Sequence, residues 1–259
     1  PLERQASLTG WIMTSGGLGA LAATAPLDAA LHLAGWRDIF FVLAGLTLVV
    51  AAWLFASVPE GKGASSPEAL ATQWKGVKTV FGSAHFWRFA PLGLCLTGGF
   101  MAVQSLWSIS WLMQVDGYTR ALAADHMAGM SAAMLLAYVL IGLLATALAK
   151  RGIKPVQLLG AGLGLSLVTL ALIVSGAGGQ SYLLWLAYGS FSSFGTLAYS
   201  QAAAGFPLAL SGRAHTAFNL MVFIGAFGVQ WGLGLLIDLL QGYGQSAGTA
   251  HRSAFLVLF

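Results

Sequence analysis

Charged side chains are scarce in this sequence. Only 8% of its 259 residues are Asp, Glu, Lys or Arg, whereas soluble domains carry about 25%. So few charges cannot cover a globule of this size with polar surface, and 58% of the residues are hydrophobic. Lipid is therefore the expected solvent for most of the chain. We predict an integral, multi-pass membrane protein and expect it in a bacterial inner membrane.

Cysteine and catalytic motifs are also scarce. Cys95 is the single cysteine, so no internal disulfide can form, and we interpret it as a packing residue. The five histidines are scattered, and no two lie four residues apart, so we predict neither a metal site nor a cofactor. The sequence contains no Gly-x-Ser-x-Gly motif and no P-loop. We therefore predict that the protein is not an enzyme.

Long uncharged segments predict an all-α polytopic bundle. Each is long enough to cross the hydrocarbon core as a helix of about 20 residues, the form that satisfies backbone groups within one segment. The segments are 5–27, 39–58, 89–115, 127–149, two within 155–212 that are separated by a Gly-rich turn at 176–181, and 216–237. Residues 254–259 predict the start of a further helix. We expect seven complete transmembrane helices and a truncated eighth, and we interpret a chain that begins with Pro1 as a fragment.

The basic residues are divided unevenly between the two sides that these crossings define. The net charge of +4 comes from thinly spread bases, which favours topology signals over a nucleic-acid partner. One side holds nine bases, Arg4, Lys62, Lys75, Lys78, Arg88, Lys150, Arg151, Lys154 and Arg213, and the other holds three, Arg37, Arg120 and Arg252. Since bases are enriched in cytoplasmic loops, we predict that the nine are cytoplasmic.

Pairs of glycines four residues apart predict close contacts between helices. Gly160 with Gly164, and Gly228 with Gly232, are small-residue pairs of the kind that lets two helix backbones approach each other.

The longest polar segment, residues 59–85, contains a predicted amphipathic helix. Ser66-Pro67-Glu68 is typical of a helix start, and Leu70, Trp74, Val77 and Phe81 then recur at helical spacing. Two interpretations stay open. The helix lies on the cytoplasmic leaflet, or it is a linker helix packed on the bundle.

Two stretches resemble members of the major facilitator superfamily. Residues 15–40, SGGLGALAATAPLDAALHLAGWRDIF, resemble that family's fifth helix, outer loop and sixth helix, and residues 206–240 resemble its tenth-to-eleventh-helix turn with Gly-Arg. The resemblance implies three regions. Residues 1–58 would be the last two helices of an N-terminal bundle, 59–88 a cytoplasmic linker, and 89–259 a C-terminal bundle truncated in its last helix.

The resemblance also implies a function. Members of the family carry small solutes across the membrane by alternating access, in secondary active or facilitative transport. It implies structural or gating roles for Arg37 and Asp38 at the outer mouth, and for Arg213. The sequence departs from the family where Lys150-Arg151-Gly152 lacks an acidic residue, so a latch at that loop would work differently.

Polar and aromatic side chains recur along single faces of the predicted helices. Thr97, Met101, Gln104, Ser108 and Trp111 follow a helical period, as do Tyr188, Ser192, Thr196 and Tyr199, while Asn219 and Gln230 lie three turns apart. Two interpretations stay open, namely hydrogen bonds between helices and a solute path. The predicted solute-binding residues are Gln104, Trp107, Ser108, Trp111, Tyr188, Tyr199, Asn219 and Gln230.

No acid or base lies well inside the spans between residues 39 and 237. We therefore expect a neutral or weakly polar solute. Any proton or ion coupling would require a titratable group in N-terminal helices that precede this sequence, and the chain as given is not expected to transport by itself. The alternative function is a transporter-like sensor that signals through residues 59–85.

Overall fold

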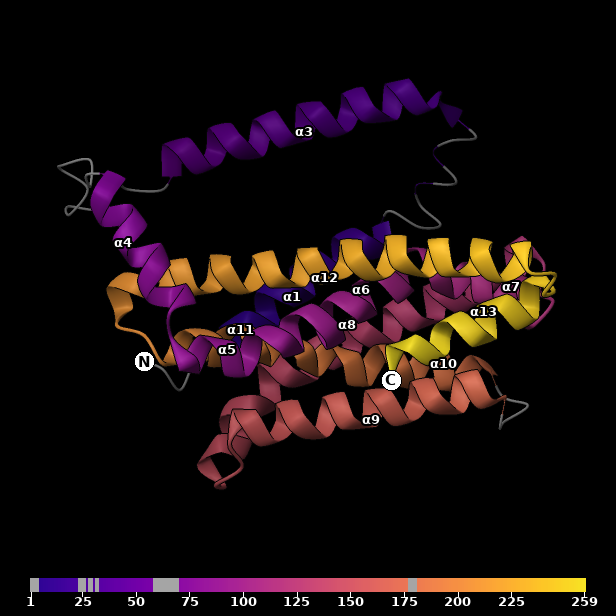
Figure 1. Ribbon diagram of the computed structural model, residues 1–259. Coiled ribbons are helices and arrows are strands. Elements are labelled where there is room, and N and C mark those ends of the chain that lie inside the picture. The colour runs from indigo at the N-terminus through magenta and orange to yellow at the C-terminus, as the bar shows by residue number, and fades with distance from the viewer. Residues whose placement is uncertain (1–4, 23–26, 28–29, 31–32, 58–69, 177–180) are drawn as a thin grey trace.

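The computed structural model describes residues 5–22, 27, 30, 33–57, 70–176 and 181–259. Within these ranges the chain contains helices and no strand, and most helices run along one common axis (Figure 1). The α-helices are α1 (Gln5–Ala22), α3 (Trp36–Ser57), α4 (Leu70–Phe81), α5 (Ala84–Pro91), α6 (Gly98–Ala102), α7 (Ser108–Gln114), α8 (Arg120–Lys150), α9 (Pro155–Ser175), α10 (Ser181–Ser192), α11 (Leu197–Ala204), α12 (Leu208–Gly242) and α13 (Ala247–Phe255). Two π-helical segments, η2 (Leu92–Thr97) and η3 (Val103–Trp107), and two 3₁₀ segments, η4 (Ser193–Thr196) and η5 (Leu256–Leu258), join them.

The all-α membrane bundle predicted from the sequence is confirmed. Within the described ranges, five helical segments are long and apolar enough to cross a membrane, judged by length and composition. They are Trp36–Ser57, Ala84–Gln114, Arg120–Lys150, Pro155–Ser175 and Leu208–Gly242. The other two predicted spans correspond to α1, whose continuation lies partly outside the described residues, and to the run α10–η4–α11, which a 3₁₀ turn interrupts.

Several helices begin earlier than the charges in the sequence suggest. The predicted starts at Met127, Thr216 and Ala254 are wrong, because α8, α12 and α13 begin seven to eight residues before them. The Ser246 hydroxyl accepts a hydrogen bond from the Thr249 backbone N–H and caps α13. Charged residues are thus included in the terminal turns of these helices, where a long side chain can reach the polar layer.

Basic residues gather at one end of the bundle. Figure 1 shows α4, the beginnings of α5 and α12, and the α8–α9 turn at the same end, drawn at the left. These segments carry seven of the nine bases predicted to be cytoplasmic, namely Lys75, Lys78, Arg88, Lys150, Arg151, Lys154 and Arg213. Arg4 and Lys62 lie outside the described residues. The grouping follows the predicted sidedness, and the cytoplasmic assignment itself stays a prediction.

The glycines at the tightest helix contacts differ from those predicted. Among the described residues, a Cβ at Gly160, Gly164, Gly228 or Gly232 would meet no atom within 4 Å, so the prediction of close contacts at these pairs is wrong. Instead η2 and α6 cross α12 at Gly98 and Gly225. A Cβ on Gly98 would lie 2.8 Å from the Ala226 backbone nitrogen, and one on Gly225 would collide with the Leu94 carbonyl oxygen. Spacing alone does not identify which face of a helix meets a neighbour.

The helices before the linker pack differently from each other. α1 runs along α8 and also contacts η4 and α11. Gly17 of α1 faces this surface, since a Cβ there would lie 3.1 Å from Leu135 and 3.7 Å from the Tyr138 ring. By contrast, α3 has no buried residue.

The predicted amphipathic helix forms as α4 and packs on the bundle with one face. Gly76 and Val80 are buried, while Trp74, Lys75 and Lys78 on the other side are exposed. The predicted helix start at residues 66–68 lies outside the described residues. The structure therefore shows that α4 packs on the bundle through its Gly76 side, while the linker role and the placement of the exposed side on the membrane surface stay predictions.

Candidate functional site

The helical segment Ala84–Gln114 carries two π-helical turns, η2 and η3. Such turns are rare and frequently mark functional positions. They also change the angle between residues before and after them. The predicted polar stripe on this segment is therefore not a single face, because Met101 is 38% exposed whereas Ser108 and Trp111 are 0% and 1% exposed. Gln104, between them, is half-buried.

Tyr199 and Asn219, both predicted as site residues, meet each other. The Tyr199 hydroxyl of α11 donates a hydrogen bond of 2.9 Å to Oδ1 of Asn219 on α12. The Tyr199 ring also packs edge-on against Phe218, with centroids 4.8 Å apart. Both polar residues are half-buried. This is a bond between two side chains of different helices at a position that is only partly enclosed.

Two further polar residues lie near this pair and were not predicted. The Tyr138 side chain of α8 lies close to Ser193 of η4 and to Tyr199 of α11. Ser193 in turn donates 2.9 Å to the Gly189 carbonyl. We call Tyr138, Ser193, Tyr199 and Asn219 the inner polar group. It borders the surface of α8, η4 and α11 that α1 contacts. The one sequence signal for Tyr138 is a phenol in an otherwise apolar span.

A second set of polar residues lies nearer the other end of the bundle. The Trp107 indole N–H donates 3.2 Å to the backbone oxygen of Gln230, and the Trp107 ring lies 6.0 Å from the ring of His251. His251 is 4% exposed, with Nδ1 2.7 Å from the Ala247 carbonyl and Nε2 2.7 Å from the Ser110 hydroxyl. We call Trp107, Ser110, Gln230 and His251 the outer polar group.

The hydrogen-bond partners of His251 determine which of its ring nitrogens donates and which accepts. A carbonyl can only accept, so Nδ1 of His251 donates to Ala247, and in the neutral imidazole Nε2 accepts from Ser110. The sequence brings Trp107 and Gln230 forward as candidates but gives no sign of His251 or Ser110, because both depend on how α13 folds back on α7.

Two predicted site residues lie in the packed interior. Ser108 donates 2.8 Å to the carbonyl of Val103 in its own helical segment. Trp111 packs against Phe255, with ring centroids 4.7 Å apart, and lies under the Arg252 guanidinium. These contacts give both side chains structural partners.

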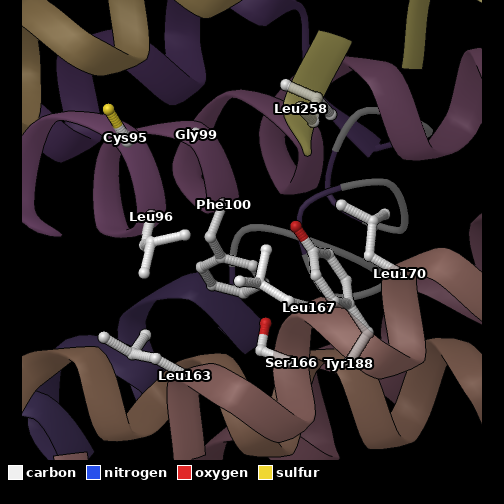
Figure 2. A pocket seen from close by; sticks show the side chains of 10 residues that line it. All are labelled: Cys95, Leu96, Gly99, Phe100, Leu163, Ser166, Leu167, Leu170, Tyr188 and Leu258. Carbon is white, nitrogen blue, oxygen red and sulfur yellow. The ribbon is translucent and has the colours of Figure 1, made fainter. Parts of the chain in front are cut away.

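Tyr188 borders a small pocket between the helical segment Ala84–Gln114, α9 and α10. Figure 2 shows the Phe100 and Tyr188 rings side by side in it, with centroids 5.3 Å apart. The lining residues are Cys95, Leu96, Gly99, Phe100, Leu163, Ser166, Leu167, Leu170, Tyr188 and Leu258. Ser166 is already paired, since its hydroxyl lies 2.6 Å from that of Ser192. The pocket is thus mainly apolar.

The predicted gating residues lie at helix ends. Arg37 covers the Trp36 ring at 4.4 Å, and the Asp38 carboxylate accepts 3.2 Å from the Gly35 N–H at the start of α3. Arg213, near the start of α12, packs against Gly76 of α4. These contacts fix helix ends and the linker, and the gating role stays a prediction.

Charge is kept out of the middle of the bundle. In the part of the chain that the structure describes, every Asp, Glu, Lys and Arg lies in a loop, in α4 or in the first or last turns of a helix. The same residues contain no group of three His, Cys, Asp or Glu side chains close enough to hold a metal ion. The groups available in mid-bundle are phenols, hydroxyls, amides and indoles, which form hydrogen bonds without carrying charge.

Comparison with known proteins identifies the family. A family model described as Major Facilitator Superfamily matches residues 1–229, most of the chain. No curated protein and no solved structure matches the sequence. The family match agrees with the apolar helical bundle, and members of this family carry small solutes across lipid bilayers. The chain therefore belongs to the Major Facilitator Superfamily and is an integral, multi-pass membrane protein of a transporter family.

Proposed function

We propose that this protein carries a small, neutral or weakly polar solute by alternating access, and that the inner polar group borders the solute path. The observation that carries the proposal is the hydrogen bond between Tyr199 and Asn219. It joins two helices at a half-buried site, so a solute with a hydroxyl or amide group can replace either partner without leaving a polar atom unpaired.

The surroundings of the pair support this proposal. Tyr138 lies beside Tyr199 and within reach of α1, so three helices contribute to one polar surface. We propose that α1 and α3 belong to one bundle, that residues 59–88 link it to a second, and that α1 covers the path from the opposite bundle. Gln104 is half-buried and remains a candidate, whereas Ser108 and Trp111 are core residues.

Among the described residues, no charged side chain lies in the middle of the bundle, and this favours an uncharged solute. A charged solute needs a counter-charge when it leaves water, and phenols and amides do not supply one. We therefore propose an uncharged solute rich in hydrogen-bonding groups. The bacterial inner-membrane location stays a prediction.

Binding of paired probes tests this proposal. Purified protein in detergent would be heated with glucose or gluconate, and with nicotinamide or nicotinate, so that each pair differs mainly in charge. We expect an uncharged probe to raise the unfolding temperature more than its anionic partner, because ligand binding stabilises the folded state by mass action. The Asn219→Ala variant should lose that rise, and Gln241→Ala, an exposed amide at the far end of α12, should keep it. Stronger binding of the anions, or an unchanged response in Asn219→Ala, would contradict the proposal.

A further inference from the structure

The exposed side of α4 combines an aromatic ring with two bases. Trp74 is 64% exposed, and Lys78 follows it four residues later, on the same side of the helix. Lys75 lies next to Trp74 in sequence and is also exposed. The Thr79 hydroxyl donates 2.8 Å to the Lys75 carbonyl, so this polar group is satisfied within the helix. The exposed side is therefore basic and aromatic at once.

The opposite side of α4 fixes the helix to the bundle. Val80 is fully buried, and Gly76 packs so closely on α12 that a Cβ there would lie 2.9 Å from Cδ of Arg213. The Trp87 indole N–H donates 2.7 Å to the Phe81 carbonyl and ties the end of α4 to α5. Because α4 is held in this way, the exposed side has a set orientation on the protein.

The position of α4 brings its exposed side to the level of lipid headgroups. Phe81 ends α4 only three residues before Ala84, where the apolar helical segment Ala84–Gln114 begins. Figure 1 shows α4 at the end of the bundle where α3 also ends. Trp side chains favour this interfacial layer, and nearby lysines attract anionic lipids.

We propose that Trp74, Lys75 and Lys78 form a binding site for the headgroup of an anionic phospholipid. The two ammonium groups attract the anionic headgroup and donate hydrogen bonds to its phosphodiester oxygens, and the Trp74 ring lies against the glycerol and upper acyl region. Each lysine near such a surface strengthens binding by about fivefold. The proposal concerns the linker surface and is independent of the solute path.

Lipid-specific quenching of Trp74 fluorescence tests this site. The full chain would be placed in phosphatidylcholine vesicles that contain either brominated phosphatidylglycerol or brominated phosphatidylcholine. The signal of Trp74 is obtained by subtracting the Trp74→Phe variant from the unsubstituted protein. We expect brominated phosphatidylglycerol to quench this signal at a lower mole fraction than brominated phosphatidylcholine. High salt should reduce the difference, since it screens exposed charges.

Charge variants decide whether the two lysines are responsible. The Lys75→Gln/Lys78→Gln double variant should lose about 25-fold in preference for phosphatidylglycerol, the product of two fivefold effects. The Lys150→Gln/Lys154→Gln variant removes two bases at the same end of the bundle and should keep the preference. Glutamine retains helix propensity, and circular dichroism of each variant checks that α4 remains folded. Equal quenching by the two lipids, a Trp74→Phe signal that matches the unsubstituted protein, or a preference that survives in the double variant would overturn the proposal.

Discussion

The inner and outer polar groups differ in how their side chains are held. In the inner group, the Tyr199 hydroxyl and the Asn219 amide bond to each other and are half-buried. In the outer group, Trp107 is bonded to a backbone carbonyl. His251 is almost fully enclosed and is bonded both to a backbone carbonyl and to the Ser110 hydroxyl. The Tyr199–Asn219 pair lies at a partly open site, where either side chain can exchange partners, whereas the buried Trp107 and His251 side chains are tied to backbone carbonyls and serve packing.

The two groups lie on either side of a close crossing of α12 with η2. Gly225 stands between Asn219 and Gln230 on α12, and it meets the backbone of Leu94. This crossing fixes α12 against the π-helical segment η2. The inner group thus lies beside a firm core and borders the surface that α1 contacts, an arrangement that fits the proposed solute path.

The largest expected effect is on the core beside the outer group. Trp111→Ala removes an indole that is 1% exposed and packs on Phe255, so we expect a loss of about 3–5 kcal/mol in the free energy of unfolding. The midpoint of denaturant unfolding in detergent measures it. Trp231→Ala removes an exposed indole of α12 and serves as the matched control. Equal losses in the two variants would show that Trp111 is not a core residue.

A smaller loss is expected at the crossing between the groups. Gly225→Ala introduces a methyl group against the Leu94 carbonyl, and overpacking of this kind costs about 1–3 kcal/mol. Gly228→Ala, one turn further along α12, has open space at its Cβ and should be neutral or slightly stabilising, since alanine favours helix. The same unfolding measurement applies. A larger loss in Gly228→Ala than in Gly225→Ala would reverse the assignment of the contact face.

The smallest stability effect is expected in the inner group. Tyr199→Phe and Asn219→Ala each remove one side of a partly exposed hydrogen bond, so each should cost about 1 kcal/mol. The double variant should cost less than the sum of the two, because both single changes break the same bond. A double-mutant cycle from unfolding midpoints measures this coupling. Strict additivity would mean that the pair does not interact in the protein.

The sequence predicts the helices well and their contacts poorly. Apolar length and the turn at residues 176–181 identify the helical runs, because a segment in lipid must satisfy its own backbone. The positions of charged residues predict the starts of α8, α12 and α13 too late. Basic residues can lie within the terminal turns of a helix, because their long side chains extend toward water. The glycine pairs also predict the wrong contacts, because their spacing shows that two glycines share a helix face but not which helix packs against that face.

The sequence predicts some residues of the candidate site but not which of them contact each other. Tyr199 and Asn219 stand out as polar positions in apolar spans, yet their hydrogen bond depends on the packing of α11 on α12. Tyr138 and Ser193 join them only through tertiary structure. A regular helical spacing predicts that Ser108 and Trp111 share a face with Gln104. The π-helical turns in the segment Ala84–Gln114 interrupt that spacing. No simple pattern in the sequence marks such turns.

The most direct test of the inner group as part of a solute path is water access at Asn219. With Cys95→Ser as background, a membrane-impermeant maleimide would be applied to Asn219→Cys and to Ser108→Cys, a near-isosteric change at a fully buried position. The reagent would be added to membranes opened to both sides. We predict rapid labelling of Asn219→Cys and labelling of Ser108→Cys only after denaturation. Equal protection of both positions would contradict a water-filled path at the inner polar group.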